Sequence, residues 1–135
     1  MTELTVQAIV DNLPKVTEFI DAQLEALDCA MRPQMQIDVA IDELFANIAR
    51  YAYGGETGEA TVRFDFDPAD RMASVTFVDS GVPFDPLKKV DPDVTLSAEQ
   101  REIGGLGIFL VKKTMDNMTY RYEDGKNVLT IYKHI

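Results

Sequence analysis

Two pairs of short β-like segments constrain the fold of this chain most strongly. Residues 61–66 alternate apolar and polar side chains, and residues 73–78 follow after a turn-forming stretch. Residues 119–122 and 128–133 repeat this arrangement on either side of Asp124-Gly125. Alternation places apolar side chains on one face of a sheet, and a short turn between two such segments is typical of an antiparallel hairpin. The sequence therefore predicts a mostly antiparallel sheet with one apolar face.

Three further stretches carry apolar residues at helical spacing, over residues 14–27, 33–52 and 107–115. A weak alternation over residues 4–10 predicts a strand before the first of them. The expected order is strand, helix, helix, two strands, loop, helix, two strands. Helices grouped between hairpins favour an α+β fold, a two-layer sandwich with the helices packed on one face of the sheet. A doubly wound parallel sheet would need stricter alternation of strands and helices. At 135 residues the chain is long enough to bury a core, and we expect residues 1–135 to form a single domain.

Composition excludes several classes of function. The formal net charge of −10 opposes binding to phosphate backbones, so we expect no direct nucleic-acid partner. No apolar run approaches the roughly 20 residues of a membrane span, and no basic segment precedes a hydrophobic stretch at the N-terminus. We therefore expect a cytoplasmic protein with no membrane partner. Cys29 is the only cysteine and His134 the only histidine, so an internal disulfide or a zinc cluster is not expected.

Glu43 and Asn47 are candidate functional residues on the second predicted helix. Four-residue spacing puts both side chains on one face of the helix. An amide oxygen of Asn47 can bind Mg²⁺ that bridges nucleotide phosphates, and Glu43 can act as a general base. A pair of this kind is also common on a solvated surface, so the spacing alone does not decide between the two interpretations.

Two glycine-containing segments complete the candidate site. Asp79 ends a predicted strand, and Gly81 lets the backbone approach a flat ligand, so the carboxylate can accept the amino group of adenine. The alternative is an ordinary turn. Gly104, Gly105 and Gly107 lie where the last helix starts, so free amides there can cradle phosphate, or the glycines can form a hinge. The long stretch between these segments, residues 85–103, is expected to be a loop or flap.

The three segments, in this order and with the long loop before the third, resemble the N, G1 and G2 boxes of the GHKL ATPase superfamily. Residues 42–53, 78–85 and 104–111 are similar to the small anti-sigma-factor serine kinases within it. The resemblance spans nearly the whole chain and implies the Bergerat fold. Members of that family bind Mg·ATP, sequester a sigma factor and phosphorylate a serine of an anti-anti-sigma protein of the STAS type. They tend to dimerise, so a homodimer is possible here.

The resemblance also implies a role for each matched residue. Glu43 would be the catalytic base, and Asn47 the magnesium ligand. The residues that it implies for nucleotide binding are Asn47, Asp79, Gly81, Gly104, Gly105, Gly107 and Thr130. Two positions depart from the family pattern: many relatives have histidine where Tyr51 stands, and some have arginine where this chain has Ile103.

Three other functions remain open from the sequence alone. The chain could use a nucleotide only as a conformational ligand and control a partner without phosphoryl transfer. It could be an ATPase or histidine-kinase catalytic fragment, although 135 residues leave no room for a histidine-bearing dimerisation helix. It could also be a scaffold whose pocket binds nothing. Neither signature of eukaryotic-type kinase chemistry is present.

Overall fold

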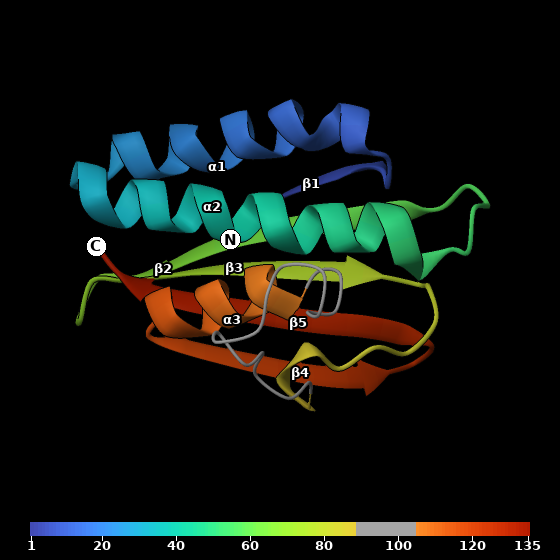
Figure 1. The fold of residues 1–135 in the computed structure, drawn as a ribbon. Coiled ribbons are helices and arrows are strands. Elements are labelled where there is room, and N and C mark those ends of the chain that lie inside the picture. The colour runs from blue at the N-terminus through green and yellow to red at the C-terminus, as the bar shows by residue number, and fades with distance from the viewer. Residues whose placement is uncertain (89–104) are drawn as a thin grey trace.

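One layer of the molecule is a sheet and the other is formed by helices (Figure 1). The structure is a computed structural model that describes residues 1–88 and 105–135. Its strands are β1 (Thr2–Gln7), β2 (Glu59–Asp67), β3 (Met72–Asp79), β4 (Asn117–Glu123) and β5 (Lys126–His134). They are arranged in the order β1-β2-β3-β5-β4, and every pair of neighbours is antiparallel. The antiparallel sheet predicted from the hairpins is therefore confirmed.

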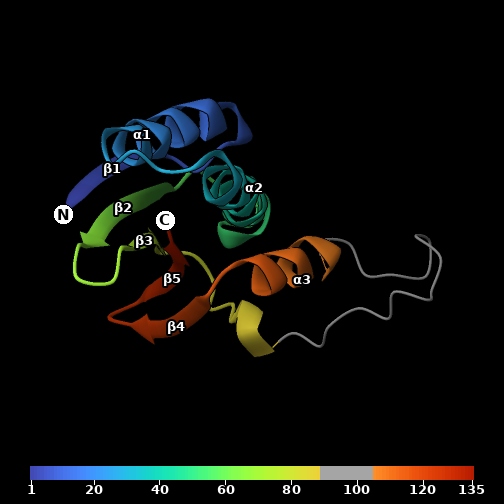
Figure 2. The same ribbon diagram turned by 90° about the vertical axis from the view of Figure 1, so that its left-hand side faces the viewer.

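Helices α1 (Leu13–Ala26), α2 (Met31–Asn47) and α3 (Gly105–Thr114) cover the same face of this sheet (Figure 2). Helix α1 buries Val16, Ile20 and Leu24, which are four residues apart and so form one apolar stripe. Strand β2 turns its alternate residues toward the helices and away from them. The α+β two-layer sandwich expected from the order of the elements is confirmed.

The core fills the space between these two layers. Its largest fully buried side chains are Phe45 of α2 and Phe77 of β3, each no more than 1% exposed. Burying an aromatic side chain of this size contributes on the order of 2–3 kcal/mol. The opposite face of the sheet carries paired threonines, of which Thr76 and Thr130 share a hydrogen bond of 2.9 Å. Only the helix-covered face therefore carries the main hydrophobic core.

The first strand is shorter than predicted. Alternation suggested residues 4–10, whereas β1 ends at Gln7 and a 3-10 turn follows at Val10–Asn12. The Asn12 side chain donates a hydrogen bond of 2.9 Å to the Gln7 carbonyl oxygen. This bond closes a turn, so Val10 leaves the sheet and is 43% exposed.

The second helix also differs from the prediction. Helix α2 ends at Asn47 and continues as one π-helical turn, Ile48–Ala52, instead of as α-helix to residue 52. The Ala52 carbonyl oxygen accepts a hydrogen bond of 2.9 Å from the Val82 amide, so the loop after β3 holds the end of this turn. Gly54 and Gly55 then adopt positive φ values of 59° and 89°, and the chain leaves the helix where their sequence predicted.

The closing hairpin is as expected. Asp124 and Gly125 both have positive φ and join β4 to β5 in a two-residue turn, with Glu123 opposite Lys126. Of the predicted loop at residues 85–103, Pro86–Lys88 forms a 3-10 turn and residues 89–103 lie outside the described residues. No helix in residues 1–88 or 105–135 has both the length and the apolar composition to cross a membrane.

Candidate nucleotide-binding site

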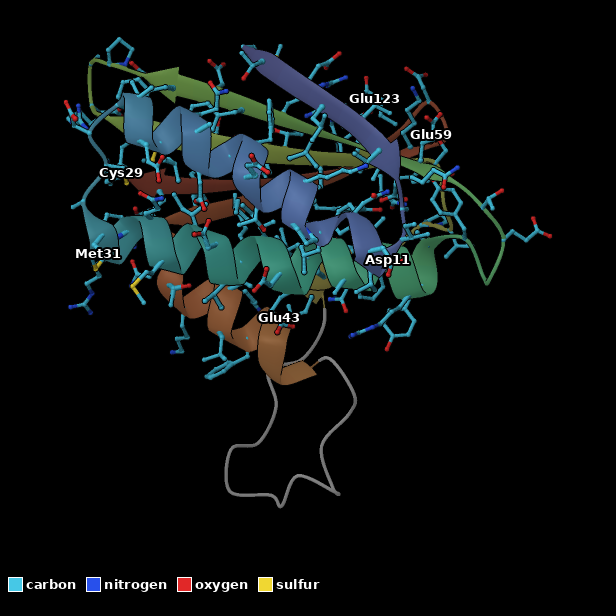
Figure 3. The ribbon with its side chains drawn as sticks, turned by 90° about the horizontal axis from the view of Figure 1, so that it is seen from above. Asp11, Cys29, Met31, Glu43, Glu59 and Glu123 are labelled. Carbon is cyan, nitrogen blue, oxygen red and sulfur yellow. The ribbon has the colours of Figure 1, made fainter. Side chains whose placement is uncertain are left out.

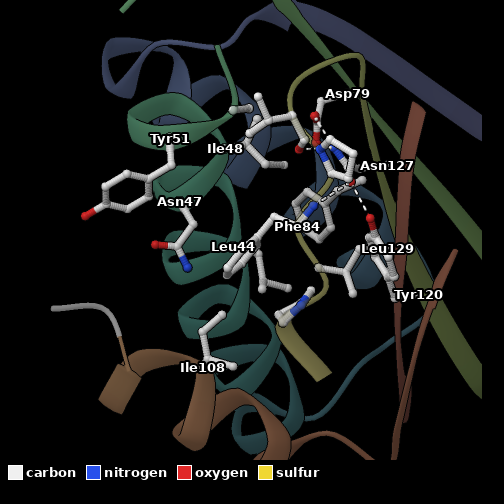
Figure 4. A pocket seen from close by; sticks show the side chains of 15 residues that line it. Leu44, Asn47, Ile48, Tyr51, Asp79, Phe84, Ile108, Tyr120, Asn127 and Leu129 are labelled. Carbon is white, nitrogen blue, oxygen red and sulfur yellow. Dashed lines mark hydrogen bonds between the residues drawn. The ribbon is translucent and has the colours of Figure 1, made fainter. Parts of the chain in front are cut away.

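A cavity of about 460 Å³ opens between α2, α3 and the ends of β3 and β5 (Figure 4). This volume lies within the roughly 300–1,000 Å³ typical of small-molecule sites. Most of its walls are apolar, with a few polar side chains among them. The lining side chains that argue for a ligand are Asn47, Tyr51, Asp79, Tyr120 and Asn127.

Asp79 is the buried charge of the cavity. It ends β3 on the helix-covered face, as Phe77 does two residues earlier, and is only 6% exposed. Its Oδ1 accepts hydrogen bonds of 2.9 Å from the Gly81 amide and 2.9 Å from Asn127 Nδ2. Within the described residues, no hydrogen bond ends on the other oxygen, Oδ2. The carboxylate is therefore held in place while one oxygen stays available to a donor in the cavity.

The loop after β3 packs directly against the end of the π-helical turn. A Cβ atom built on Gly81 would lie 2.2 Å from the Ala52 carbonyl oxygen, so only glycine fits there. Tyr53 fastens the same loop, because its hydroxyl group donates to the Glu59 carbonyl oxygen at 2.5 Å and accepts from the Ser80 amide at 2.9 Å. Gly81 thus allows close backbone approach to the π-helical turn, whereas the approach to a flat ligand expected from its sequence position stays a prediction.

Asn47 reaches the cavity from the last turn of α2, and Tyr51 stands near its mouth with 53% of its surface exposed (Figure 4). The Asn47 side chain makes no hydrogen bond within the described part of the chain. An amide at a cavity wall without a partner is suited to a ligand or a cation. Asn47 and Asp79, predicted from separate segments, are both wall residues of this one cavity.

Glu43 lies beside the start of α3. A Cβ atom built on Gly107 would be 1.9 Å from Glu43 Oε2, so the carboxylate rests against the backbone of the first turn of α3. Figure 3 shows Glu43 on the side of α2 that faces α3. The neighbours of these two residues, Leu44 and Ile108, line the cavity. The carboxylate therefore sits at the edge of the cavity rather than in its wall.

The predicted glycine segment is only partly described. Gly105 begins α3 and Gly107 follows in its first turn, where helix amides have no partner in the helix. Gly104, like Arg101 and Ile103, lies outside the described residues. The two glycines that are described lie at a helix start, as the sequence indicated.

Thr130 does not reach the cavity. Its neighbours Leu129 and Ile131 belong to the core on the helix side, so Thr130 points to the opposite face, toward Thr76. The residue beside Asp79 on β5 is Asn127, which the sequence reasoning missed. A signal was available in the spacing, because Asn127 stands two and four positions before the apolar Leu129 and Ile131, so alternation places all three on one face of the strand.

The described part of the site offers no cluster of metal-ligating side chains. Among residues 1–88 and 105–135, no group of three or more His, Cys, Asp and Glu side chains could hold a metal ion. Mg²⁺ often binds through one or two protein oxygens, several waters and substrate phosphates, so an amide such as Asn47 fits this mode better than a protein cage would.

Comparison with known proteins assigns the chain to a family. The family model of the histidine kinase-like ATPase domain matches residues 6–133. The serine-protein kinase RsbW of Listeria monocytogenes serovar 1/2a is 34% identical over 98 residues, which are 69% of this chain and 61% of that protein. A Bacillus cereus serine-protein kinase RsbW is 36% identical over 95 residues, 67% of this chain and 58% of that protein.

The chain thus spans somewhat less than two thirds of the length of these curated relatives. The family match, in contrast, covers nearly all of this chain. It agrees with the antiparallel sheet covered by three helices and with the three segments that meet around the cavity. The chain therefore belongs to the histidine kinase-like ATPase domain family, the GHKL group that its sequence resembles.

Proposed function

We propose that the cavity binds Mg·ATP with the adenine ring against Asp79. The observation that carries this proposal is the Asp79 carboxylate, buried and held through Oδ1 while Oδ2 has no partner in the described chain. An acceptor of this kind at the end of an apolar cavity selects a flat ligand with an amino group. The phosphates would then extend toward Asn47 and the start of α3, where Gly105 and Gly107 lie in the first helical turn and the amides have no partner within the helix.

Magnesium fits the donor set at the same end of the cavity. Asn47 supplies an amide oxygen without a partner in the described part of the chain. Mg²⁺ would neutralise phosphate charge there. Asn47→Ala is therefore expected to weaken nucleotide binding in the presence of Mg²⁺ and to leave the weaker binding in its absence nearly unchanged. Calorimetry with and without Mg²⁺ separates these two cases.

We further propose that the chain is an anti-sigma regulatory serine kinase. Its similarity to the serine-protein kinases RsbW supports this activity. The proposed partners are a sigma factor, which the chain would sequester, and a STAS-type anti-anti-sigma protein, which it would phosphorylate, with self-association into a homodimer.

Glu43 is the proposed general base. Its carboxylate lies against the first turn of α3, next to residues that line the cavity. It would accept the proton of the partner's serine hydroxyl as the serine oxygen bonds to the γ-phosphorus. The bond from that phosphorus to the bridging oxygen breaks, and ADP leaves with its electron pair. The protein's own contribution is mainly to orient the reacting groups.

A matched pair of glutamate variants tests this function. The chain is incubated with Mg·ATP and a STAS-type protein, and phosphoserine is detected by mass spectrometry. Glu43→Gln is expected to bind ATP normally and to lose transfer by on the order of a hundredfold or more. Glu56→Gln, in an exposed loop, is the control and should transfer normally.

Two results would change the assignment. Normal transfer by Glu43→Gln would remove Glu43 as the base. Normal nucleotide binding by the unaltered chain, without transfer to any STAS-type protein, would favour a regulatory module that acts by binding alone.

A further inference from the structure

We propose that Asn127 is a positioning residue that fixes the ring-binding end of the cavity and thereby sets its preference for a ligand that donates a hydrogen bond. This inference rests on the proposed nucleotide site, which it deepens. Asn127 is 6% exposed and lies directly opposite Asp79 in the pairing of β3 with β5. It is the second buried polar residue of the cavity wall, after Asp79 itself.

The Asn127 amide connects three separate parts of the chain. Its Nδ2 donates at 2.9 Å to Asp79 Oδ1 and at 2.9 Å to the Val82 carbonyl oxygen. Its Oδ1 accepts from the Phe84 amide at 3.1 Å and from the hydroxyl group of Tyr120 on β4. Dashed lines in Figure 4 mark bonds of this network. One side chain on β5 therefore ties the end of β3, the loop after it and β4 together.

The orientation of this amide is fixed by groups that cannot exchange roles. A carboxylate and a carbonyl oxygen only accept, so they require the NH₂ group, and the Phe84 backbone N–H only donates, so it requires the oxygen. The Tyr120 phenol is protonated at neutral pH even at its ordinary pKa of 10.0, and burial raises that pKa further, so the hydroxyl group can donate. Turning the amide over would place oxygen against oxygen at both Asp79 and Val82. The network thus has a single arrangement.

This arrangement determines which hydrogen bonds are left for a ligand. Asn127 and Gly81 occupy Asp79 Oδ1, so Oδ2 is the oxygen left to accept a hydrogen bond from a ligand. A 6-amino purine can donate to it, whereas a 6-oxo purine presents another oxygen there. An amide at residue 127 is needed because it offers two donors and an acceptor together. A carboxylate at the same position would lose the donors and place a second negative charge beside Asp79.

Calorimetric titration of the intact chain with Mg·ATP and with Mg·GTP, from about pH 5.5 to 8.5, tests the role. Asn127→Ala is expected to weaken ATP binding by roughly tenfold or more and to narrow the preference for ATP over GTP. Asn127→Asp should bind ATP poorly at high pH and regain affinity as the pH falls, because one proton on the carboxyl pair restores a donor. Asn117→Asp makes the same chemical change at an exposed position of β4 and should keep the pH profile of the unaltered chain.

The outcomes separate the inference from the proposed function. An unaltered chain that binds neither nucleotide contradicts the nucleotide site itself. If the unaltered chain binds ATP, the inference is overturned by a folded Asn127→Ala with unchanged affinity and preference, or by an Asn127→Asp profile that follows that of Asn117→Asp. Tyr120→Phe covers the case in which Asn127→Ala does not fold. It removes only one donor to Asn127, so a several-fold loss of ATP affinity supports the inference and unchanged affinity opposes it.

Discussion

Replacing Asp38 by Asn should make the protein more stable at high pH. Asp38 on α2 faces Asp21 on α1, and Oδ1 of each is buried where no N–H or O–H group of another described residue reaches it, so a bond between the two carboxyl groups forms only when one is protonated. Burial, the hydrogen bond to Asp21 and then the charges of Asp21, Asp42 and Glu25 raise the pKa of Asp38 to about 7. With this pKa, the folded protein holds a proton between the two carboxyl groups below about pH 7 and loses it above.

Stability falls as the pH rises because the folded state binds more protons at Asp38 than the unfolded state does. The pKa of Asp38 is about 7 in the folded chain, against 3.8 as its ordinary value. Between these values the folded state binds more protons, so the stabilisation is fully present below about pH 4 and is lost as the pH rises through 7. At about 1.4 kcal/mol for each unit of pKa difference, the stabilisation lost as the pH rises is at most roughly 4 kcal/mol. Asp38 is only partly buried, so solvent screens its charge. We therefore expect the Asp38→Asn substitution to raise the free energy of unfolding at pH 8 by about 1–2 kcal/mol.

Urea unfolding of the unaltered chain and of Asp38→Asn across this pH range is the assay. The free energy of unfolding of the variant should fall less between about pH 5 and 8. Asp65→Asn, which removes an exposed carboxylate from β2, controls for general charge effects and should run parallel to the unaltered chain. Parallel curves for Asp38→Asn and the unaltered chain would refute the shared proton.

Three further substitutions test the packing around the cavity. Tyr53→Phe removes two hydrogen bonds that join β2 to the loop after β3, and thermal melting should show a loss of about 1–2 kcal/mol. Gly81→Ala forces a Cβ against the Ala52 carbonyl oxygen, so both melting temperature and ATP affinity should fall, and unchanged values would contradict the close approach. Gly107→Ala displaces only the flexible end of the Glu43 side chain, so the melting temperature should change little. The rate of phosphoryl transfer should fall, because Glu43 is the proposed base, and an unchanged rate would contradict this contact.

The architecture was largely predictable because its signals are local. The turn at Asp124-Gly125 and the alternation of β2 reappear directly as hairpins. Asn47 and Asp79 could also be identified, because helical spacing and a strand-ending carboxylate are visible in a single segment of sequence. Their meeting in one cavity followed only from the family pattern, since no local rule predicts which segments a fold brings together.

The missed features depend on contacts between distant segments. A π-helical turn replaces the α-helix after Asn47, and the loop after β3 binds the end of that turn at the Ala52 carbonyl oxygen. The sequence of α2 alone carries no sign of that bond. Thr130 was expected at the cavity because the family resemblance implies a residue of the last strand that supports the adenine site. Once Leu129 and Ile131 are placed on the helix side, alternation turns Thr130 away and brings Asn127 to Asp79.

Titration of the unaltered chain with ATP and ADP at saturating Mg²⁺ tests the central claim most directly. Calorimetry should detect binding at a single site, and Asp79→Ala should abolish it while the variant remains folded by circular dichroism. A folded, unaltered chain that releases no heat with either nucleotide would contradict the proposal that this cavity is a nucleotide site.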